Sequence, residues 1–388
     1  MPAYSATRPC TGKFFVIMVT TLGPETLIAV SGARAPETAI KSRREPATGS
    51  GRDDMISWDG SIGEDVVRVR AIAVSELGGP EVLVACEQPD PVARPGQILV
   101  EVAAAGINFI DVYRRSGVYR QPVPYVPGAE GAGVVAAVGE GVTHFAEGDH
   151  VAWCDAPACY AERAAVDAAA AVPVPDGIDL KVAAAVMLQG LTAHYLCRST
   201  FPVQPGQVAV VHAAAGGVGL LLTQMIKSLG GTVIATTSST AKAALAQRAG
   251  ADHVTTYGEF GEVTRKATDG KGADVVFDGV GKDTFDASLA ALRPRGMMVL
   301  FGGSSGQVPP FDLQRLNSGG SLFVTRPTLA NYTADRAELL WRAGDVFAAI
   351  AEGELDVRIG AEYPLAEAPR AHEDLAARRT TGKLVLIP

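Results

Sequence analysis

Residues 208–219 read VAVVHAAAGGVG, and this stretch decides the fold. Its first four residues are apolar, as in a buried strand, and the segment Val218–Leu229 that follows has the apolar spacing of a helix. The turn between them departs from the common G-x-G-x-x-G dinucleotide fingerprint, because the key positions hold Ala213, Gly216 and Gly219. The order of strand, glycine turn and helix is nevertheless the order that a dinucleotide site requires.

The glycine turn leaves room for a pyrophosphate. Two adjacent glycines let the backbone approach the phosphates, and the third lets the helix pack close to the strand. The N-terminus of the helix adds free N–H groups and a positive dipole. On this motif alone, a tight strand–helix turn that binds nothing stays an alternative. The sequence predicts cofactor contacts along the turn, at Ala215, Gly216, Gly217, Val218 and Gly219.

The end of the next strand, Thr232–Thr236, distinguishes the two nicotinamide cofactors. Chains that bind NAD carry an acid about 20 residues after the first glycine, where it holds the ribose diol. Here the strand runs into Thr237, Ser238 and Ser239, and Lys242 follows. Hydroxyls and a cation suit a 2′-phosphate, which favours NADP. The alternative is a solvated helix start, with a hydroxyl as the N-cap and an exposed lysine.

Strands and helices alternate after about residue 180. Alternation of this kind predicts a parallel, doubly wound α/β sheet. The expected strands are Val208–His212, Thr232–Thr236, Asp274–Asp278, Met297–Phe301 and Leu322–Thr325, and the expected helices are Leu180–Thr200, Val218–Leu229 and Ala241–Ala249.

The segment before residue 180 has a different rhythm. It carries many short strands separated by glycine-rich turns, which predicts a β-rich, barrel-like domain. The expected strands are Val67–Val74, Ile98–Val102, Gly131–Val138 and His150–Trp153, and the tail adds a helix, Ala334–Ala351, and a strand, Lys383–Ile387.

The composition excludes several classes of protein. Of the 388 residues, 47% are hydrophobic and 20% are charged, so the chain is not wholly disordered. Its length exceeds the roughly 250–300 residues of one core, which predicts two domains. The 34 basic and 42 acidic residues give a net charge of −8, a poor match for nucleic acid or an anionic membrane.

The five cysteines are an odd number and form no C-x-x-C pair. A disulfide framework or a four-cysteine zinc site is therefore disfavoured, which favours a reducing compartment and a cytoplasmic location. The longest early apolar run, Phe14–Val19, is far shorter than the roughly 20 residues of a membrane span.

Residues 1–66 differ from the rest of the chain. Their second half is polar, which predicts a disordered extension, or an upstream choice of start site with the real start near Met55 or Val66. A targeting peptide is the alternative, because Arg8 and Lys13 precede an apolar stretch and residues 33–35 resemble a small-residue cleavage site.

Several further motifs occur in a fixed order along the chain. With them, the sequence from about residue 68 to Pro388 resembles the medium-chain dehydrogenase/reductase superfamily, and within it the zeta-crystallin-like branch of bacterial NADPH:quinone oxidoreductases. The motifs are Gly78–Leu83 (GGPEVL), Ala105–Asp111 (AGINFID), Tyr113–Tyr119 (YRRSGVY), Pro127–Gly133 (PGAEGAG), Asp278–Gly281 (DGVG) and Phe301–Gly306 (FGGSSG).

The resemblance implies a GroES-like β-barrel catalytic domain with an inserted Rossmann domain, and a homodimer. The implied boundaries are 67–190 for the catalytic domain, 191–328 for the NADP-binding domain and 329–388 for the return to the first. It also implies NADPH without flavin or metal. Zinc-dependent members carry a cysteine ligand where this chain has Ile107-Asn108, and Gly-His-Glu where it has Gly128-Ala129-Glu130.

The resemblance also carries over the site residues. Asn108, Asp111 and Tyr113 match the nicotinamide side, and Ser238, Lys242 and Tyr257 match the region around the 2′-phosphate. The remaining matching positions are Thr192, Gly217, Val218, Phe301, Ser304 and Arg378.

A quinone is electrophilic, so hydride transfer needs close positioning and a donor to the developing oxygen charge. Asn108, Tyr113 and Tyr119 are the candidate catalytic donors. Each tyrosine is alternatively a structural aromatic, Asn108 could hold the nicotinamide carboxamide, and Asp111 could only orient its neighbours. His212 is expected to be a satisfied core histidine.

The sequence thus predicts an NADPH-dependent quinone reductase. One alternative is an NADPH-dependent enone or enoyl-thioester reductase on the same scaffold. The others are a non-catalytic NADPH-binding protein, such as a redox sensor, and the structural or RNA-binding roles of some zeta-crystallin relatives.

Overall fold

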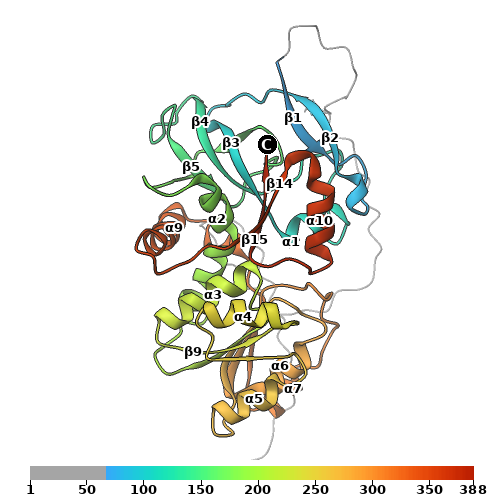
Figure 1. Ribbon diagram of the computed structural model, residues 1–388, viewed down its shortest axis with the longest axis vertical. Helices are drawn as coiled ribbons and strands as arrows, with labels where there is room; N and C mark the ends of the chain where they lie inside the picture. The colour runs from blue at the N-terminus through green and yellow to red at the C-terminus, as the bar shows by residue number, and fades with distance from the viewer. Residues whose placement is uncertain (1–66) are drawn as a thin grey trace, which may run out of the picture. The chain divides into compact units, whose positions relative to one another are not determined.

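The computed structural model describes residues 67–388 (Figure 1). The predictions for residues 1–66 fall outside the described residues. Two large sheets organise the described part of the chain, a mixed sheet of seven strands and a parallel sheet of six.

The seven-stranded sheet is built around one long strand, β3, which pairs with β4, β6 and β15. The strand order is β14-β15-β3-β4-β5-β7, and a separate antiparallel pair, β1-β2, lies beside it. The last strand of the chain therefore pairs with one of the first. The bounds are β1 (Arg68–Ala73), β2 (Val84–Pro89), β3 (Gln97–Ile107), β4 (Glu130–Val138), β5 (His150–Trp153), β6 (Arg163–Asp167), β7 (Val172–Pro173), β14 (Ile359–Pro364) and β15 (Lys383–Ile387).

The six-stranded sheet is wholly parallel and has the order β10-β9-β8-β11-β12-β13. The order reverses at β8, so the turn after β8 lies at the switch point where open α/β sheets bind ligands. The strands are β8 (Val208–Val211), β9 (Thr232–Thr236), β10 (His253–Thr255), β11 (Ala273–Asp278), β12 (Leu292–Leu300) and β13 (Phe323–Thr325).

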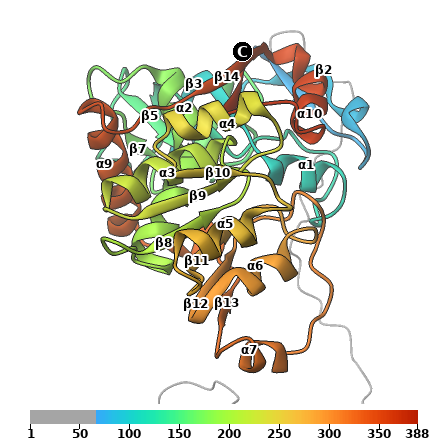
Figure 2. The same cartoon turned by 60° about the horizontal axis from the view of Figure 1, so that its bottom comes forward.

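Helices cover both faces of this parallel sheet, because successive strand residues point to opposite sides (Figure 2). Val211 packs with α3 and α4 on one face, and Val210 packs with α5 and α6 on the other. This is the doubly wound arrangement that the sequence predicts. The helices are α3 (Gly217–Ser228), α4 (Thr240–Arg248), α5 (Phe260–Ala267), α6 (Phe285–Ala291) and α7 (Gln314–Ser318).

A buried helix, α2 (Leu180–Tyr195), connects the two sheets. It packs against β3, β4, β5 and β15 of one sheet and against α3 of the other, and a π-helical turn, η2, extends it to Thr200. The run Leu180–Thr200 is apolar and long enough to cross a membrane, yet 72% of its apolar window is buried inside the protein. The predicted domain boundary between residues 190 and 191 falls inside α2.

The remaining helices are α1 (Phe109–Arg115), α8 (Leu329–Tyr332), α9 (Arg336–Ala351), α10 (Ala368–Ala376) and the short turns η1 (Pro80–Val82) and η3 (Leu365–Glu367).

Most predicted elements are present. Strands β5 and β15 have the predicted bounds, and α3, α4 and α9 begin or end within two residues of them. The strand predicted at Met297–Phe301 begins earlier, since β12 starts at Leu292. Its first part contains Pro294 and Gly296, which are not typical of strands and precede the apolar part. Helices α5, α6 and α10 are not predicted, because with 8, 7 and 9 residues they give too few turns for an apolar spacing to stand out.

Helix α1 is fixed to the barrel by the buried side chain of Asp111. The Asn108 backbone N–H donates to Asp111 Oδ2 (2.9 Å), and so does the Tyr160 hydroxyl (3.1 Å). The same hydroxyl lies 3.1 Å from His372 Nε2 on α10. Burial raises the pKa of the Asp111 carboxyl to about 6 and lowers the pKa of His372 to about 3.

These shifts predict the pH dependence of stability. Asp111 binds its proton more tightly in the folded state than in the unfolded state, so its contribution to the free energy of unfolding falls by up to ~3 kcal/mol as the pH rises from about 4 to about 6. His372 contributes the opposite slope, because it binds a proton more weakly when folded. Comparison of the wild type with Asp111→Asn isolates the first effect.

In urea titrations between pH 4 and pH 7, the stability of the wild type should fall relative to that of Asp111→Asn as the pH rises. Two profiles that run parallel across this range would contradict the assignment of a raised pKa to Asp111.

Candidate active site

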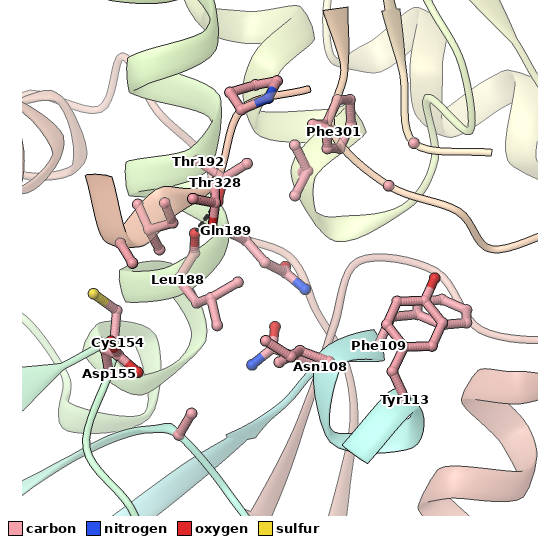
Figure 3. A pocket seen from close by; sticks show the side chains of 18 of the residues that line it. Asn108, Phe109, Tyr113, Cys154, Asp155, Leu188, Gln189, Thr192, Phe301 and Thr328 are labelled. Atoms are coloured by element: carbon pink, nitrogen blue, oxygen red, sulfur yellow. Dashed lines mark hydrogen bonds between the residues drawn. The ribbon is translucent and has the colours of Figure 1, made fainter. Parts of the chain in front are cut away.

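A pocket of about 560 Å³ lies between α1 and α2, the start of α3 and the loops after β11 and β12 (Figure 3). Leu188 and Gln189 extend into it from α2, opposite Asn108 at the start of α1, and Phe301 lies on its far side. The lining of this pocket includes seven of the predicted site residues, namely Asn108, Tyr113, Tyr119, Thr192, Val218, Phe301 and Ser304.

Gly219 packs too tightly against the turn for a side chain, because a Cβ there would lie 2.5 Å from the Ala213 carbonyl oxygen. Gly217 lies against the end of the Gln189 side chain, whose Oε1 would be 1.6 Å from an added Cβ. Since α3 begins at Gly217, its first backbone N–H groups have no partner within the helix. Gln189 Oε1 is itself buried without a hydrogen-bond partner. The turn therefore offers the helix terminus that a pyrophosphate binds.

Two cations, Lys242 and Arg378, lie together beyond the turn. Lys242 Nζ donates to the Arg378 carbonyl oxygen (2.7 Å), and Arg378 Nη2 donates to the Ser304 carbonyl oxygen (2.6 Å). Within residues 67–388, neither side chain forms an ion pair with an acid. Burial, and then the charge of Arg378, lower the pKa of Lys242. Two neighbouring cations without an acid between them favour the binding of an anion, as a 2′-phosphate requires.

Two other residues predicted for this end line a neighbouring hollow of about 890 Å³. Ser238 follows β9 and Tyr257 follows β10, so the carboxyl ends of adjacent parallel strands bring them to the same edge. The Tyr257 ring stacks on His212, with centroids 5.8 Å apart. His212 is buried, and its two ring nitrogens lie 2.9 Å from the hydroxyls of Thr236 and Ser288, as expected for a core histidine.

Two phenol rings stand on the barrel side of the main pocket. Tyr113 and Tyr119 make an edge-to-face contact with centroids 5.4 Å apart. Burial raises the pKa of Tyr113, so its hydroxyl stays protonated at neutral pH. Tyr119 is 39% exposed, which places it at the mouth. Both hydroxyls can donate a hydrogen bond to a group in the pocket.

Asn108 belongs to a buried cluster that the sequence pattern does not reveal. Lys383 Nζ donates to Asn108 Oδ1 (2.7 Å) and pairs with Glu130 Oε2, to which Asn108 Nδ2 also donates (2.7 Å). Glu130 Oε1 accepts the Leu188 backbone N–H (2.6 Å). The sequence offered one sign of this cluster, since each of the apolar strands β4 and β15 begins with a charged residue, Glu130 and Lys383.

Asp111 does not reach the wall of the main pocket. Its carboxylate is turned into the barrel, where it accepts from the Asn108 backbone and from Tyr160. The prediction that it contacts the cofactor therefore finds no support in its position, and the alternative role of orienting its neighbours fits. Within residues 67–388, no group of three or more His, Cys, Asp and Glu side chains is placed to hold a metal ion.

Two protein-family models match the chain. The model described as the alcohol dehydrogenase GroES-like domain matches residues 94–197, and the model described as zinc-binding dehydrogenase matches residues 217–335. The predicted combination of a GroES-like barrel with a Rossmann domain is thus confirmed.

Similar proteins cover nearly the whole described part. A quinone oxidoreductase of Pseudomonas aeruginosa is 45% identical, with 82% of this chain and 99% of the relative covered. The solved structure of an Escherichia coli quinone oxidoreductase complexed with NADPH is 43% identical, with a TM-score of 0.80 and coverage of 82% and 100%. A 2-haloacrylate reductase of a Burkholderia species is 39% identical, with coverage of 82% and 99%. By these similarities and by its fold, the chain belongs to the quinone oxidoreductase branch of the medium-chain dehydrogenase/reductase family.

Proposed function

We propose that this chain is an NADPH-dependent quinone reductase that works without a metal or a flavin. The main support for this function is that one pocket is lined by the start of a helix on one side and by hydrogen-bond donors on the other. One wall is the start of α3, at Val218, and the other presents amide and phenol donors, at Asn108, Tyr113 and Tyr119. Such a pocket holds a cofactor and an electron acceptor side by side.

The residues present fit NADPH. The helix terminus at Gly217 suits the pyrophosphate, and Lys242 and Arg378 supply cations for a 2′-phosphate. Gln189 Oε1 is a buried acceptor in need of a donor. The E. coli relative whose structure contains NADPH supports the same cofactor. We assign to the cofactor side Thr192, Ala215, Gly216, Gly217, Val218, Gly219, Ser238, Lys242, Tyr257, Phe301, Ser304 and Arg378.

Bound NADPH supplies a hydride from its nicotinamide ring. The protein's main task is then to hold an acceptor that is already electrophilic, since positioning lowers much of the barrier. Tyr113 and Tyr119 are assigned as donors to the acceptor oxygen, where negative charge develops during reduction. Asn108 is assigned as a third donor, and we call the part of the lining that it forms above Lys383 and Glu130 the pocket floor.

A second candidate function is reduction of a conjugated carbon–carbon double bond. The observation that favours it is the relative named 2-haloacrylate reductase, which is named for an alkene rather than for a quinone. The same donors would serve a carbonyl conjugated to the alkene.

The remaining expectations concern partners and location. β13 is one of the two outer strands of the parallel sheet, and its Phe323 is 55% exposed, which supports a homodimer through this edge. The net charge of −8 supports a chain without a nucleic-acid or anionic-membrane partner. We expect a cytoplasmic protein.

The acceptor experiment tests the reaction class. Oxidation of NADPH by the purified protein is followed at 340 nm with 1,4-benzoquinone or a simple enone as the acceptor. We expect fast turnover with the quinone, little with the enone, and slower turnover when NADH replaces NADPH. Turnover of the enone alone would move the assignment to the second candidate.

The variants Lys242→Ala and Arg378→Ala test the phosphate site. Each should raise the KM for NADPH about tenfold to a hundredfold, the range expected for one lost charge-assisted hydrogen bond, and leave the KM for NADH unchanged. Arg379→Ala is the matched control, because Arg379 is adjacent but pairs with Asp374. Equal effects on both cofactors would assign the two cations to the fold instead.

A further inference from the structure

The side-chain amide of Asn108 is held in one orientation by two opposite charges. Its oxygen accepts from the Lys383 ammonium (2.7 Å), and its nitrogen donates to the Glu130 carboxylate (2.7 Å). A flipped amide would set N–H groups against the ammonium and the oxygen against the carboxylate. All three residues are buried, with exposures of 4% or less, so water does not compete.

This arrangement commits the carbonyl oxygen of Asn108 to Lys383. One amide hydrogen goes to Glu130, and the second has only a long contact, 3.4 Å, with the Gly106 carbonyl oxygen. Asn108 also lines the main pocket. The amide group that it can donate to a ligand bound there is therefore its second N–H. The ammonium on its oxygen polarises the amide and makes that N–H a stronger donor.

The position of Lys383 is set by the glycine turn. The preceding residue, Gly382, donates its N–H to the Ala215 carbonyl oxygen (3.0 Å) and forms a β-bridge with Gly216. A Cβ on Gly382 would lie 2.4 Å from the Arg358 carbonyl oxygen, so the backbone there is closely confined. One short segment thus contacts both the cofactor turn and the donor of the acceptor site.

Stability alone does not explain the pair. A buried lysine and glutamate gain little over apolar residues of the same volume, because both charges lose their hydration. Burial indeed lowers the pKa of Lys383, and Glu130 opposes that lowering. Surface pairs in the same part of the fold, such as Lys181–Glu362, connect α2 to β14 without any contact with the pocket.

We propose that Lys383 is a positioning residue for reduction: with Glu130, it holds the Asn108 amide so that an N–H faces the acceptor oxygen. The role rests on the proposed function, since it requires an acceptor whose oxygen gains electrons. Lys383 itself touches neither acceptor nor cofactor in this scheme and acts through Asn108.

The test is a cycle of variants assayed with 1,4-benzoquinone and NADPH. The double variant Lys383→Met/Glu130→Gln removes both charges of the ion pair together, so neither partner is left as a buried charge facing an uncharged group. We expect its kcat to fall about 10- to 100-fold, as for the loss of one hydrogen bond to a developing negative charge. The KM and the fluorescence-measured Kd for NADPH should change less than twofold.

Asn108→Ala should lower kcat by a similar factor, and adding it to the double variant should cause no further loss, because both act through one amide. The control pair, Lys181→Met/Glu362→Gln, should leave kcat unchanged. Thermal melting and NADPH binding confirm that each variant is folded.

The outcomes separate the two proposals. Multiplicative losses in the combined variant, or an unchanged kcat in a folded double variant, would overturn the role of Lys383 and leave the quinone reductase assignment intact. A wild type that binds NADPH but reduces neither the quinone nor the enone would overturn the assignment and this role together.

Discussion

A buried ion pair connects parts of this protein that lie far apart in sequence. Lys383 opens the closing strand β15, Glu130 opens β4, and Asn108 lies between them at the start of α1. Glu130 also accepts from the backbone of α2, the helix that connects the two sheets. Removal of either charge would leave the other uncompensated in a dry environment, which is strongly unfavourable. The geometry of the pocket floor therefore depends on this pair.

The two ends of the proposed cofactor site impose different physical requirements on their residues. At the glycine turn the requirement is steric, since a side chain at Gly219 would collide with the Ala213 carbonyl. At Lys242 and Arg378 it is electrostatic, since within residues 67–388 these two neighbouring cations form no ion pair with an acid. Selectivity between cofactors can therefore vary in relatives while the turn stays the same.

Local signals explain how much the sequence could predict. The strand, the glycine turn and α3 are adjacent in sequence, so spacing alone identifies them, and the missing acid after β9 is visible in the same way. The contact of Lys383 with Asn108 spans 275 positions, and neither residue has a neighbour in sequence that indicates the other.

Asp111 illustrates a second limit of prediction from sequence. An acid in the first turn of a helix suits a helix cap as well as a ligand, and only the structure shows its carboxylate turned to Tyr160.

The mixed sheet is interrupted in sequence, because the whole parallel sheet lies between β7 and β14. The parallel sheet and its helices are made from neighbouring segments, whereas the pocket floor needs a pairing of β15 with β3. Contacts of such long sequence separation close a large loop, which has a high entropic cost. Loss of the pairing between β15 and β3 would remove Lys383 from Asn108, although the six-stranded sheet contains neither strand. A partly unfolded species without this pairing should therefore keep the parallel sheet and lack activity.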